Sequence, residues 1–351
     1  MPGTLYGFPF NEELFNYRWD QEPDPITTAL IDSGAMVADT KIASQIAAGS
    51  EVYTVPFYNT LGGTPVNYDG KTDITATETD GGSQSGIVYG RAIAWKARDF
   101  TFDFNKADPM GSIVSQVSSY WDKYRQTVML AVLKGIFGVN STTSATGADE
   151  DFLEAWELHT TNIASTTANT VAESNKLGAT TLSDAVVKAC GDNAAGKFNL
   201  AIMHSVVAQN LAGTNLLEFR KYTDPMGIER QLPITDINGM TVVVSDQVPT
   251  ATGATSQETE YTTYLVGNGF LRYAPAPVKV PSEIERDPKT NGGQDLLYTR
   301  IRETILPNGF SYVKGGSDPV SPTDAMLATA TKYMPIFDPK CLACAQVVSN
   351  G

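Results

Sequence analysis

The sequence is poor in the residues that build disulfide frameworks and metal centres. It contains three cysteines, Cys190, Cys341 and Cys344, and two histidines, His159 and His204, in 351 residues. An odd and sparse set of cysteines does not make a disulfide framework and suits a reducing compartment. No HxxxH or HxH spacing joins the two histidines, so we interpret each as a structural residue and not as a metal ligand.

Clustered positive charge and long apolar runs are also missing. The chain carries 25 Lys and Arg against 39 Asp and Glu, a formal net charge of −14. This balance argues against a nucleic-acid-binding surface, because phosphate contacts need clustered Lys and Arg. Apolar runs such as 128–133 fall short of the roughly 20 residues that a membrane span needs. The N-terminus has neither the basic region nor the apolar region of a secretory signal, so we expect none.

Compact catalytic motifs are absent as well. There is no Gly-x-Ser-x-Gly elbow and no Walker loop. The Gly-Asn-Gly at 267–269 begins a dinucleotide fingerprint, but Arg272 stands where its third glycine should be. The lone CxxC at 341–344 lacks a second ligand pair for zinc, and the acidic triplet at 149–151 is interpreted as a solvated loop and not as a calcium site. We therefore predict no catalytic residue, no metal and no cofactor.

What is present is the composition of a large α+β protein. Hydrophobic residues make up 42% and charged residues 18%, a globular balance. A single core seldom grows past roughly 250–300 residues, so two or more lobes are expected. No internal repeat and no low-complexity segment occurs.

The clearest element is a long helix at 110–137. Its apolar residues step by three and four: Ile113, Val117, Tyr120, Tyr124, Val128 and Ala131. An Asp-Pro pair at 108–109 is a typical helix start, and Gly138 is a typical stop. About 29 residues at 1.5 Å each predict a rod of roughly 44 Å.

The remaining patterns predict short elements. We expect strands at 51–58, 87–104, 198–203, 240–245, 261–266 and 296–305. We expect helices near 12–17, 26–48, 152–158, 181–191, 204–211 and 324–332. The Ala-Pro-Ala-Pro at 274–277 is interpreted as a stiff connector.

A polar hairpin follows the first expected strand. Glycine pairs mark turns at 62–63 and 81–82, Asp69-Gly70 marks another, and the stretch 72–79 is rich in threonine. A strand pair this polar cannot bury a face by itself. We predict that it projects into solvent or lies on another subunit.

The order of motifs between about 180 and 340 resembles that of a known family. The motifs are Ala-Cys-Gly-Asp at 189–192, Leu-Ala-Ile-Met-His-Ser at 200–205, Asn-Leu-Leu at 215–217, the strand at 238–246, Glu-Ile-Glu-Arg-Asp at 283–287, Gly-Gly at 292–293, Arg302, Pro-Asn-Gly-Phe at 307–310 and Ser-Pro-Thr at 321–323. In this order they resemble the major capsid proteins of tailed bacteriophages, the HK97-like fold family. Residues 50–137 match in organisation and not by motif.

The resemblance implies an architecture and a role. It implies an α+β HK97-like fold with an N-terminal arm at 1–49, an extended β-hairpin or E-loop at 50–98, a peripheral domain with a long spine helix at 99–179 and 276–351, and an axial domain at 180–275. It implies a structural subunit, not an enzyme, that forms hexamers and pentamers of an icosahedral head shell around double-stranded DNA without binding the DNA specifically. The expected location is the virion capsid, assembled in the host bacterial cytoplasm, with no membrane partner.

The resemblance also suggests partners and contacts. A portal protein is expected, and separate scaffolding and decoration proteins are optional further partners, since no scaffolding segment precedes the arm. Some relatives crosslink a hairpin lysine to a neighbour; Lys71 lies in the hairpin, but the sequence identifies no partner for it. The predicted intersubunit contact residues are Gly62, Gly63, Asp69, Gly70, Lys71, Tyr120, Trp121 and Tyr124.

Two alternatives remain open at this point. An encapsulin-type bacterial nanocompartment would share the fold but enclose a cargo protein instead of DNA. A carboxylate-dependent hydrolase, such as a glycoside hydrolase, would need a cleft rich in aromatic residues. The tryptophans Trp19, Trp95, Trp121 and Trp156 are scattered, which disfavours such a cleft.

Overall fold

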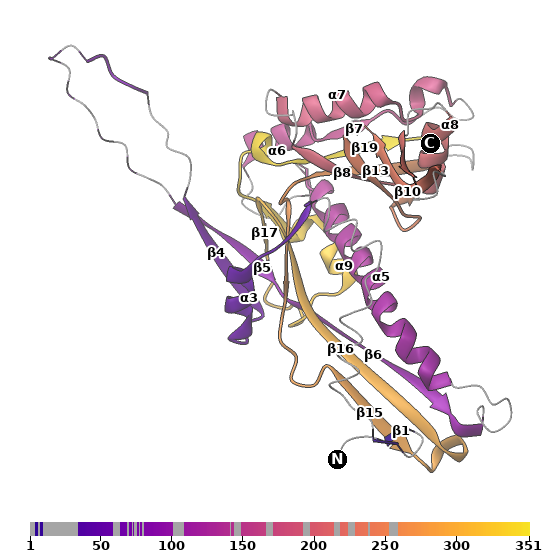
Figure 1. Ribbon diagram of the computed structural model, residues 1–351. Helices are drawn as coiled ribbons and strands as arrows, with labels where there is room; N and C mark the ends of the chain where they lie inside the picture. The colour runs from indigo at the N-terminus through magenta and orange to yellow at the C-terminus, as the bar shows by residue number, and fades with distance from the viewer. Residues whose placement is uncertain are drawn as a thin grey trace.

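The computed structural model shows an elongated molecule built around one long helix. It describes residues 4–5, 8–9, 34–58, 64–68, 70–71, 73, 76, 78, 81–100, 109–140, 142–143, 149–165, 171–191, 197–213, 218–223, 229–237, 239–252 and 259–351. Figure 1 shows a sheet with helices lying on it at the top, the long helix running down beside a slender second sheet, and a hairpin standing out to the side.

The upper sheet has eight strands and is packed on both faces. Its strand order is β7-β19-β13-β8-β11-β10-β9, with β12 beside β13. The bounds are β7 Thr160–Asn162, β8 Phe198–Met203, β9 Glu218–Thr223, β10 Glu229–Ile237, β11 Met240–Val244, β12 Thr250–Ala251, β13 Glu260–Gly267 and β19 Cys344–Ser349. Ala201 and Met203 pack with helices α7 (Ala179–Cys190) and α8 (Ser205–Gly213), while the alternate Leu200 and Ile202 face the central core. The apolar run of β8 therefore reflects burial on both faces.

The second sheet has five strands arranged around one long strand. The bounds are β3 Met36–Ala38, β6 Tyr89–Arg98, β14 Leu271–Pro275, β15 Ser282–Asp287 and β16 Gln294–Pro307. β16 pairs with β6 along one edge and with β15 and then β14 along the other, and β3 extends the sheet beyond β14. The side chains of Trp95, Ala97 and Leu297 turn toward the long helix.

Helix α5 (Pro109–Phe137) connects the two sheets, and the predicted helix is confirmed to within one residue. Its first half packs Val117 and Trp121 on the second sheet. Its second half is buried on most sides in the central core, which includes Leu133 and Ile136. Gly135 permits a close approach there, since a Cβ at this position would lie 2.5 Å from the Leu327 carbonyl oxygen.

Smaller elements complete the fold. They are β1 Thr4–Leu5, β2 Phe8–Pro9, α3 Thr40–Ala47, β4 Val52–Tyr58, β5 Gly81–Ile87, α6 Glu150–Glu157, β17 Phe310–Tyr312, α9 Asp324–Leu327 and β18 Tyr333–Pro335, with 3-10 turns at Glu173–Asn175, Thr290–Gly292, Ala330–Lys332 and Pro339–Cys341. Within the described part of the chain, no helix combines the length and the apolar character needed to cross a membrane.

Several expected elements need correction near the C-terminal half. The tail at 344–349, which has no predicted strand, forms β19 between β7 and β13 in the upper sheet. The expected connector at 274–277 is wrong in its first half, because Ala274 and Pro275 belong to β14. The helix expected at 324–332 is interrupted: α9 ends at Leu327 and a separate 3-10 turn follows. Short strands of this kind are specified by their sheet partners more than by their own residues.

Other corrections fall in the first half. The strand expected to run to 104 ends at Arg98, and Phe100 is exposed, so it does not line a strand face there. Of the helix expected at 26–48, residues 26–33 lie outside the described part and 36–38 form strand β3 instead. Helix α3 begins at Thr40, where the Asp39 side chain caps it by accepting hydrogen bonds from the backbone N–H groups of Lys41 and Ile42. The acidic triplet at 149–151 is not a loop but the start of α6, capped by Asp149. The helix expected near 12–17 lies outside the described residues.

Candidate assembly surfaces

The stem of the hairpin is locked to the body of the subunit. Strands β4 and β5 pair from Val52↔Ile87 to Tyr58↔Gly81. Buried Gln84 donates from Nε2 to the carbonyl oxygens of Pro307 at 2.7 Å and Phe310 at 2.8 Å. The stem is therefore fixed to the end of β16 and to β17.

Glycines in β5 allow aromatic rings of β4 to lie across the strand. A Cβ at Gly82 would lie 2.5 Å from the Phe57 ring, and a Cβ at Gly86 would overlap the Tyr53 ring. The Tyr53 hydroxyl is also hydrogen-bonded to Thr304 Oγ1 at 2.9 Å. Burial raises the pKa of Tyr53 well above its usual value, so this hydroxyl stays protonated. Glycine is needed at positions 82 and 86 because an aromatic ring packs directly over the strand backbone there.

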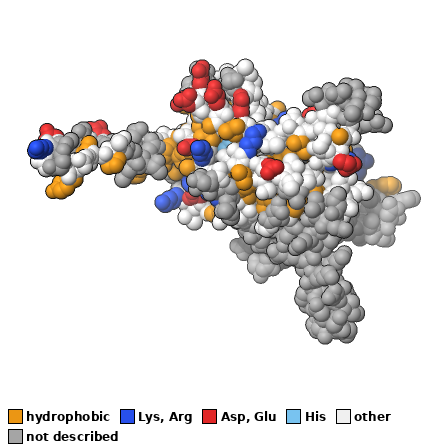
Figure 2. Space-filling view, turned by 90° about the horizontal axis from the view of Figure 1, so that it is seen from above, with side chains coloured by type: hydrophobic (Ala, Val, Ile, Leu, Met, Phe, Trp, Pro, Cys, Tyr) orange, Lys and Arg blue, Asp and Glu red, His pale blue; other side chains and the backbone are white. Residues whose placement is uncertain are grey.

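Beyond the stem, the hairpin continues as an extension with no strand among its described residues. These residues, 64–68, 70–71, 73, 76 and 78, are all exposed. Tyr68 is 91% exposed and Val66 is 45% exposed. Figure 2 shows the extension standing out from the body, with apolar and charged side chains on it. A segment of this kind gains little from its own subunit.

The predicted contact residues divide between this extension and α5. Gly70 and Lys71 are exposed on the extension. Gly70 has a φ of +71°, a turn conformation that glycine favours. Gly62, Gly63 and Asp69 lie outside the described residues.

The three aromatic residues predicted as contacts on α5 have different environments. Tyr120 is 39% exposed, whereas Trp121 is 2% exposed and packs in the cluster with Ala97 and Leu297. Tyr124 accepts a hydrogen bond from Arg91 Nε at 2.6 Å and donates to the Asp324 carboxylate at 2.7 Å. Burial, together with the Asp324 carboxylate, raises the pKa of Tyr124 to about 12. Of the three, Tyr120 presents the largest surface to solvent.

A pocket of about 280 Å³ opens beside Tyr120. Its lining comes from β6 and the first half of α5: Trp95, Ile113, Gln116, Val117, Ser119, Tyr120 and Lys123. The Trp95 and Tyr120 rings meet edge to face with their centroids 5.3 Å apart. The sequence places Trp95 on one face of a strand but does not reveal its contact with Tyr120. That contact depends on how α5 lies across β6.

A second, larger groove of about 500 Å³ lies at the base of the hairpin. It runs between β3, the start of α3, and the side chains of Phe57 and Phe337. Its floor is polar, because Asp39 and Arg272 form an ion pair there at 3.5 Å.

Buried ionic contacts hold α5 on the second sheet. Arg125 donates to both carboxylate oxygens of Glu303, at 2.8 and 3.0 Å, and to Asp122 at 2.8 Å. The Tyr89 hydroxyl donates to Glu303 at 3.2 Å. The Tyr273 ring lies 5.3 Å from the Arg125 guanidinium. Despite burial, these partners raise the pKa of Arg125, so the guanidinium stays charged.

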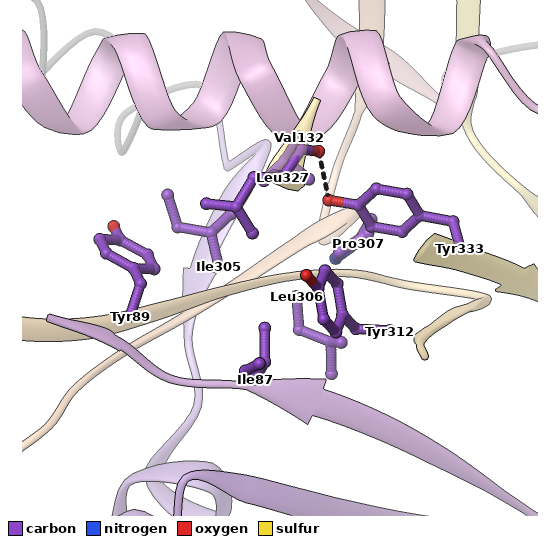
Figure 3. Close-up of a pocket in the computed structure, with 9 residues that line it drawn as sticks. All are labelled: Ile87, Tyr89, Val132, Ile305, Leu306, Pro307, Tyr312, Leu327 and Tyr333. Atoms are coloured by element: carbon purple, nitrogen blue, oxygen red, sulfur yellow. Dashed lines mark hydrogen bonds between the residues drawn. The ribbon is translucent and has the colours of Figure 1, made fainter. Parts of the chain in front are cut away.

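The interior cavity of the body is too small to be a substrate site. It measures about 10 Å³ and lies between α5, β16 and β17. Figure 3 shows its lining, with the Tyr333 hydroxyl donating to the Leu327 carbonyl at 2.8 Å. A space of this size holds at most about one water molecule.

The cysteines and histidines are placed as parts of the core or of helix ends. Burial raises the pKa of the Cys344 and Cys190 thiols, which keeps them protonated, while Cys341 is exposed. His159 Nδ1 lies 2.6 Å from the Cys344 carbonyl oxygen, and His204 Nδ1 accepts from the backbone N–H of Val206. No group of His, Cys, Asp and Glu that could hold a metal ion occurs among the residues that the structure describes.

Comparisons with known proteins point in one direction. No model of a known protein family matches the chain. It is 25% identical, over 331 residues, to the major capsid protein of Bacillus phage SPP1, covering 91% of this chain and 90% of that protein.

Solved structures give the same fold. The capsid of Ralstonia phage GP4 has a TM-score of 0.56 at 11% identity, covering 90% of this chain and 87% of that one. The capsid of cyanophage Pam1 has a TM-score of 0.52 at 11% identity, covering 86% of this chain and 85% of that one. The chain thus has the HK97-like fold of phage capsid proteins, and its sequence is similar to that of a phage major capsid protein along nine-tenths of its length, which confirms the resemblance found in its motifs.

Proposed function

We propose that this protein is the major capsid subunit of a tailed bacteriophage and that its copies assemble into an icosahedral head shell around double-stranded DNA. The observation that carries the proposal is the similarity to a phage major capsid protein over 91% of the chain. The exposed extension, held on a fixed stem, supports it, because such a segment is stabilised only when another surface covers it. The relatives found give no support to a nanocompartment shell or a hydrolase.

The domain organisation proposed for this role follows the expected division. The arm is 1–49, the hairpin 50–98, the peripheral domain 99–179 and 276–351, and the axial domain 180–275. In the upper sheet β19 pairs with β13, and β7 pairs with β19, so that sheet draws two strands from outside 180–275. The axial and peripheral domains are therefore held together by a shared sheet as well as by α5.

A shell subunit acts through the binding free energy of its contacts with other copies. Each copy makes several modest contacts, and closed symmetry makes them act together. The buried pair of Arg125 and Glu303 keeps α5 and the second sheet as one rigid platform. We propose a portal protein as a further partner, and separate scaffolding and decoration proteins as optional ones, with assembly in the host cytoplasm and no catalytic step by the subunit itself.

The test is assembly of the purified full chain, alone and with the proteins encoded beside it. Negative-stain microscopy and light scattering should show closed particles or regular hexamers and pentamers. DNA protected from nuclease inside particles would distinguish a viral shell from a nanocompartment. A strict monomer or small dimer under every condition would overturn the proposal.

A matched variant tests the part played by the hairpin. Deleting residues 59–82 should leave a folded subunit, because the core clusters contain none of the deleted residues. The variant should no longer form shells. Circular dichroism and microscopy measure the two properties separately, and normal shells from this deletion would contradict the assigned role.

A further inference from the structure

The hairpin extension carries two large apolar side chains that its own subunit does not cover. Tyr68 and Val66 lie two residues apart, and both side chains are exposed. Pro65 precedes them and stiffens the chain. Together they place exposed apolar surface near the start of a segment that is rich in threonine and aspartate.

The pocket beside Tyr120 is shaped for side chains of this kind. Trp95 and Tyr120 form two aromatic walls, and Ile113 and Val117 add aliphatic surface. Its volume of about 280 Å³ is below the roughly 300–1,000 Å³ of small-molecule sites, which suits one or two side chains. Aromatic side chains favour edge-to-face contacts with aromatic walls.

The charges of the two surfaces are complementary. Between residues 64 and 78 the extension has three carboxylates and one lysine. The pocket has Lys123 as its one charged lining residue, and Lys123 has no ion-pair partner among the described residues. In a chain of net charge −14, an unpaired lysine beside an apolar pocket favours an acidic partner.

The extension cannot reach this pocket within one subunit. Figure 1 shows the extension leaving the stem on one side of the molecule, while the first half of α5 and the far end of β6 lie on the opposite side. The stem cannot swing across, because Gln84 and Tyr53 fix it to the body. An occupant with this sequence must therefore come from a second copy.

The groove at the base of the hairpin is a poorer acceptor. Its floor holds the Asp39–Arg272 ion pair, which an apolar segment would strip of water without replacing its hydrogen bonds. The residues that line the pocket beside Tyr120 form no ion pair with any residue that the structure describes, so an apolar segment bound there would not desolvate one.

We propose that Tyr68 and Val66 of one subunit insert into the pocket formed by Trp95, Ile113 and Tyr120 of a second copy, with Lys123 facing the exposed carboxylates of Asp73 and Glu78. This inference rests on the proposed shell function. It adds the donor side chains and the acceptor pocket of one intersubunit contact, which neither the fold nor the comparisons assign.

Photo-crosslinking in assembled particles tests the contact directly. Tyr68 is replaced by benzoylphenylalanine, an aromatic residue that crosslinks on irradiation, in a mixture of isotope-labelled and unlabelled copies. Mass spectrometry should find residue 68 joined to Trp95 or to the 113–123 segment in peptide pairs of mixed label. The same replacement at Tyr58, which is exposed where β4 ends, is the matched control and should not label that segment.

The possible outcomes separate the inference from the proposed function. Particles in which residue 68 crosslinks elsewhere, or only within its own copy, would overturn the inference and leave the shell function standing. A wild-type chain that forms no particle under any condition would overturn both. If the crosslinking variant does not assemble, the alanine variants below decide the matter.

Alanine variants give a second readout that needs no probe. Tyr68→Ala and Tyr120→Ala should each raise the subunit concentration at which particles appear by about tenfold, which corresponds to about 1.4 kcal/mol. The double variant should be little worse than either single one, because both remove the same contact. Tyr58→Ala should change the threshold less than twofold. Thresholds for Tyr68→Ala and Tyr120→Ala that match the Tyr58→Ala value, or that simply multiply in the double variant, would refute the pairing.

Discussion

Breaking the buried ion pair between α5 and β16 should destabilise the subunit severely. The perturbation is Glu303→Ala. Glu303 is 2% exposed and accepts two hydrogen bonds from Arg125 and one from Tyr89. Its removal leaves a guanidinium in the interface with Asp122 as the remaining carboxylate, at 2.8 Å. Removing one partner of a buried pair costs about 3–5 kcal/mol, and because Asp122 remains we expect about 3 kcal/mol.

Replacing the whole network should cost much less than breaking it. The triple variant Arg125→Met, Glu303→Leu and Tyr89→Phe removes the guanidinium, the Glu303 carboxylate and the Tyr89 hydroxyl together. The Asp122 carboxylate then loses Arg125, but its side chain is 14% exposed and reaches water. Apolar residues of similar volume often match a buried ion pair in stability, so we expect a change within about 1 kcal/mol of wild type. Keeping Tyr89 would leave its hydroxyl unpaired, at a cost of about 1–3 kcal/mol.

Urea unfolding of the full chain at protein concentrations too low for assembly measures these changes. Fluorescence of Trp121, which packs on the same face of α5, reports on the interface. A Glu303→Ala variant that loses less than about 1 kcal/mol would show that water screens the pair. A triple variant as unstable as the single one would show that the cost comes from altered packing and not from an isolated charge.

Two further predictions concern the stem and the core. Gly86→Ala should destabilise the hairpin stem by about 1–3 kcal/mol, because the new Cβ overlaps the Tyr53 ring. The control Gly213→Ala, whose Cβ meets nothing within 4 Å, should change the free energy of unfolding little. Thermal unfolding compares the two variants, and equal losses of stability would contradict the packing argument. Burial lowers the pKa of His159 in the folded protein below its usual value of 6.5. Between these two pKa values the unfolded chain binds more protons than the folded chain, so the free energy of unfolding should fall as the pH drops through this window. His159→Phe, which keeps a ring against Trp156, should flatten this part of the pH profile measured by urea unfolding, and an unchanged slope would exclude His159 as its source.

The strongly periodic elements could be predicted from the sequence because their pattern is local. The helix at 110–137 repeats its apolar stripe over eight turns, and the apolar run at 198–203 reports a strand buried on both faces. The tail at 344–349 could not be predicted in this way. It is a strand because β13 and β7 lie on either side of it, and its own six residues carry no comparable signal.

The candidate contact residues show the same limit. The stripe on α5 includes Tyr120 and Tyr124, and sequence periodicity places both on one face. The structure separates them: Tyr124 is held inside by Arg91 and Asp324, whereas Tyr120 turns to solvent beside Trp95. Periodicity fixes the angle of a side chain around the helix axis, but not what packs against that angle at each turn.

The sequence by itself determined the absence of compact catalytic motifs, the long helix, the polar hairpin and the order of motifs that resembles a phage capsid protein. These follow from residue types and local spacing. Only the tertiary structure decided that the hairpin stem is anchored through Gln84, that Arg125 and Glu303 form a buried pair, and that Trp95 and Tyr120 enclose a pocket. Each of these depends on residues from different elements, whose meeting is set by how α5 packs on β6 and β16 and how β5 packs on β16 and β17, and not by any local pattern.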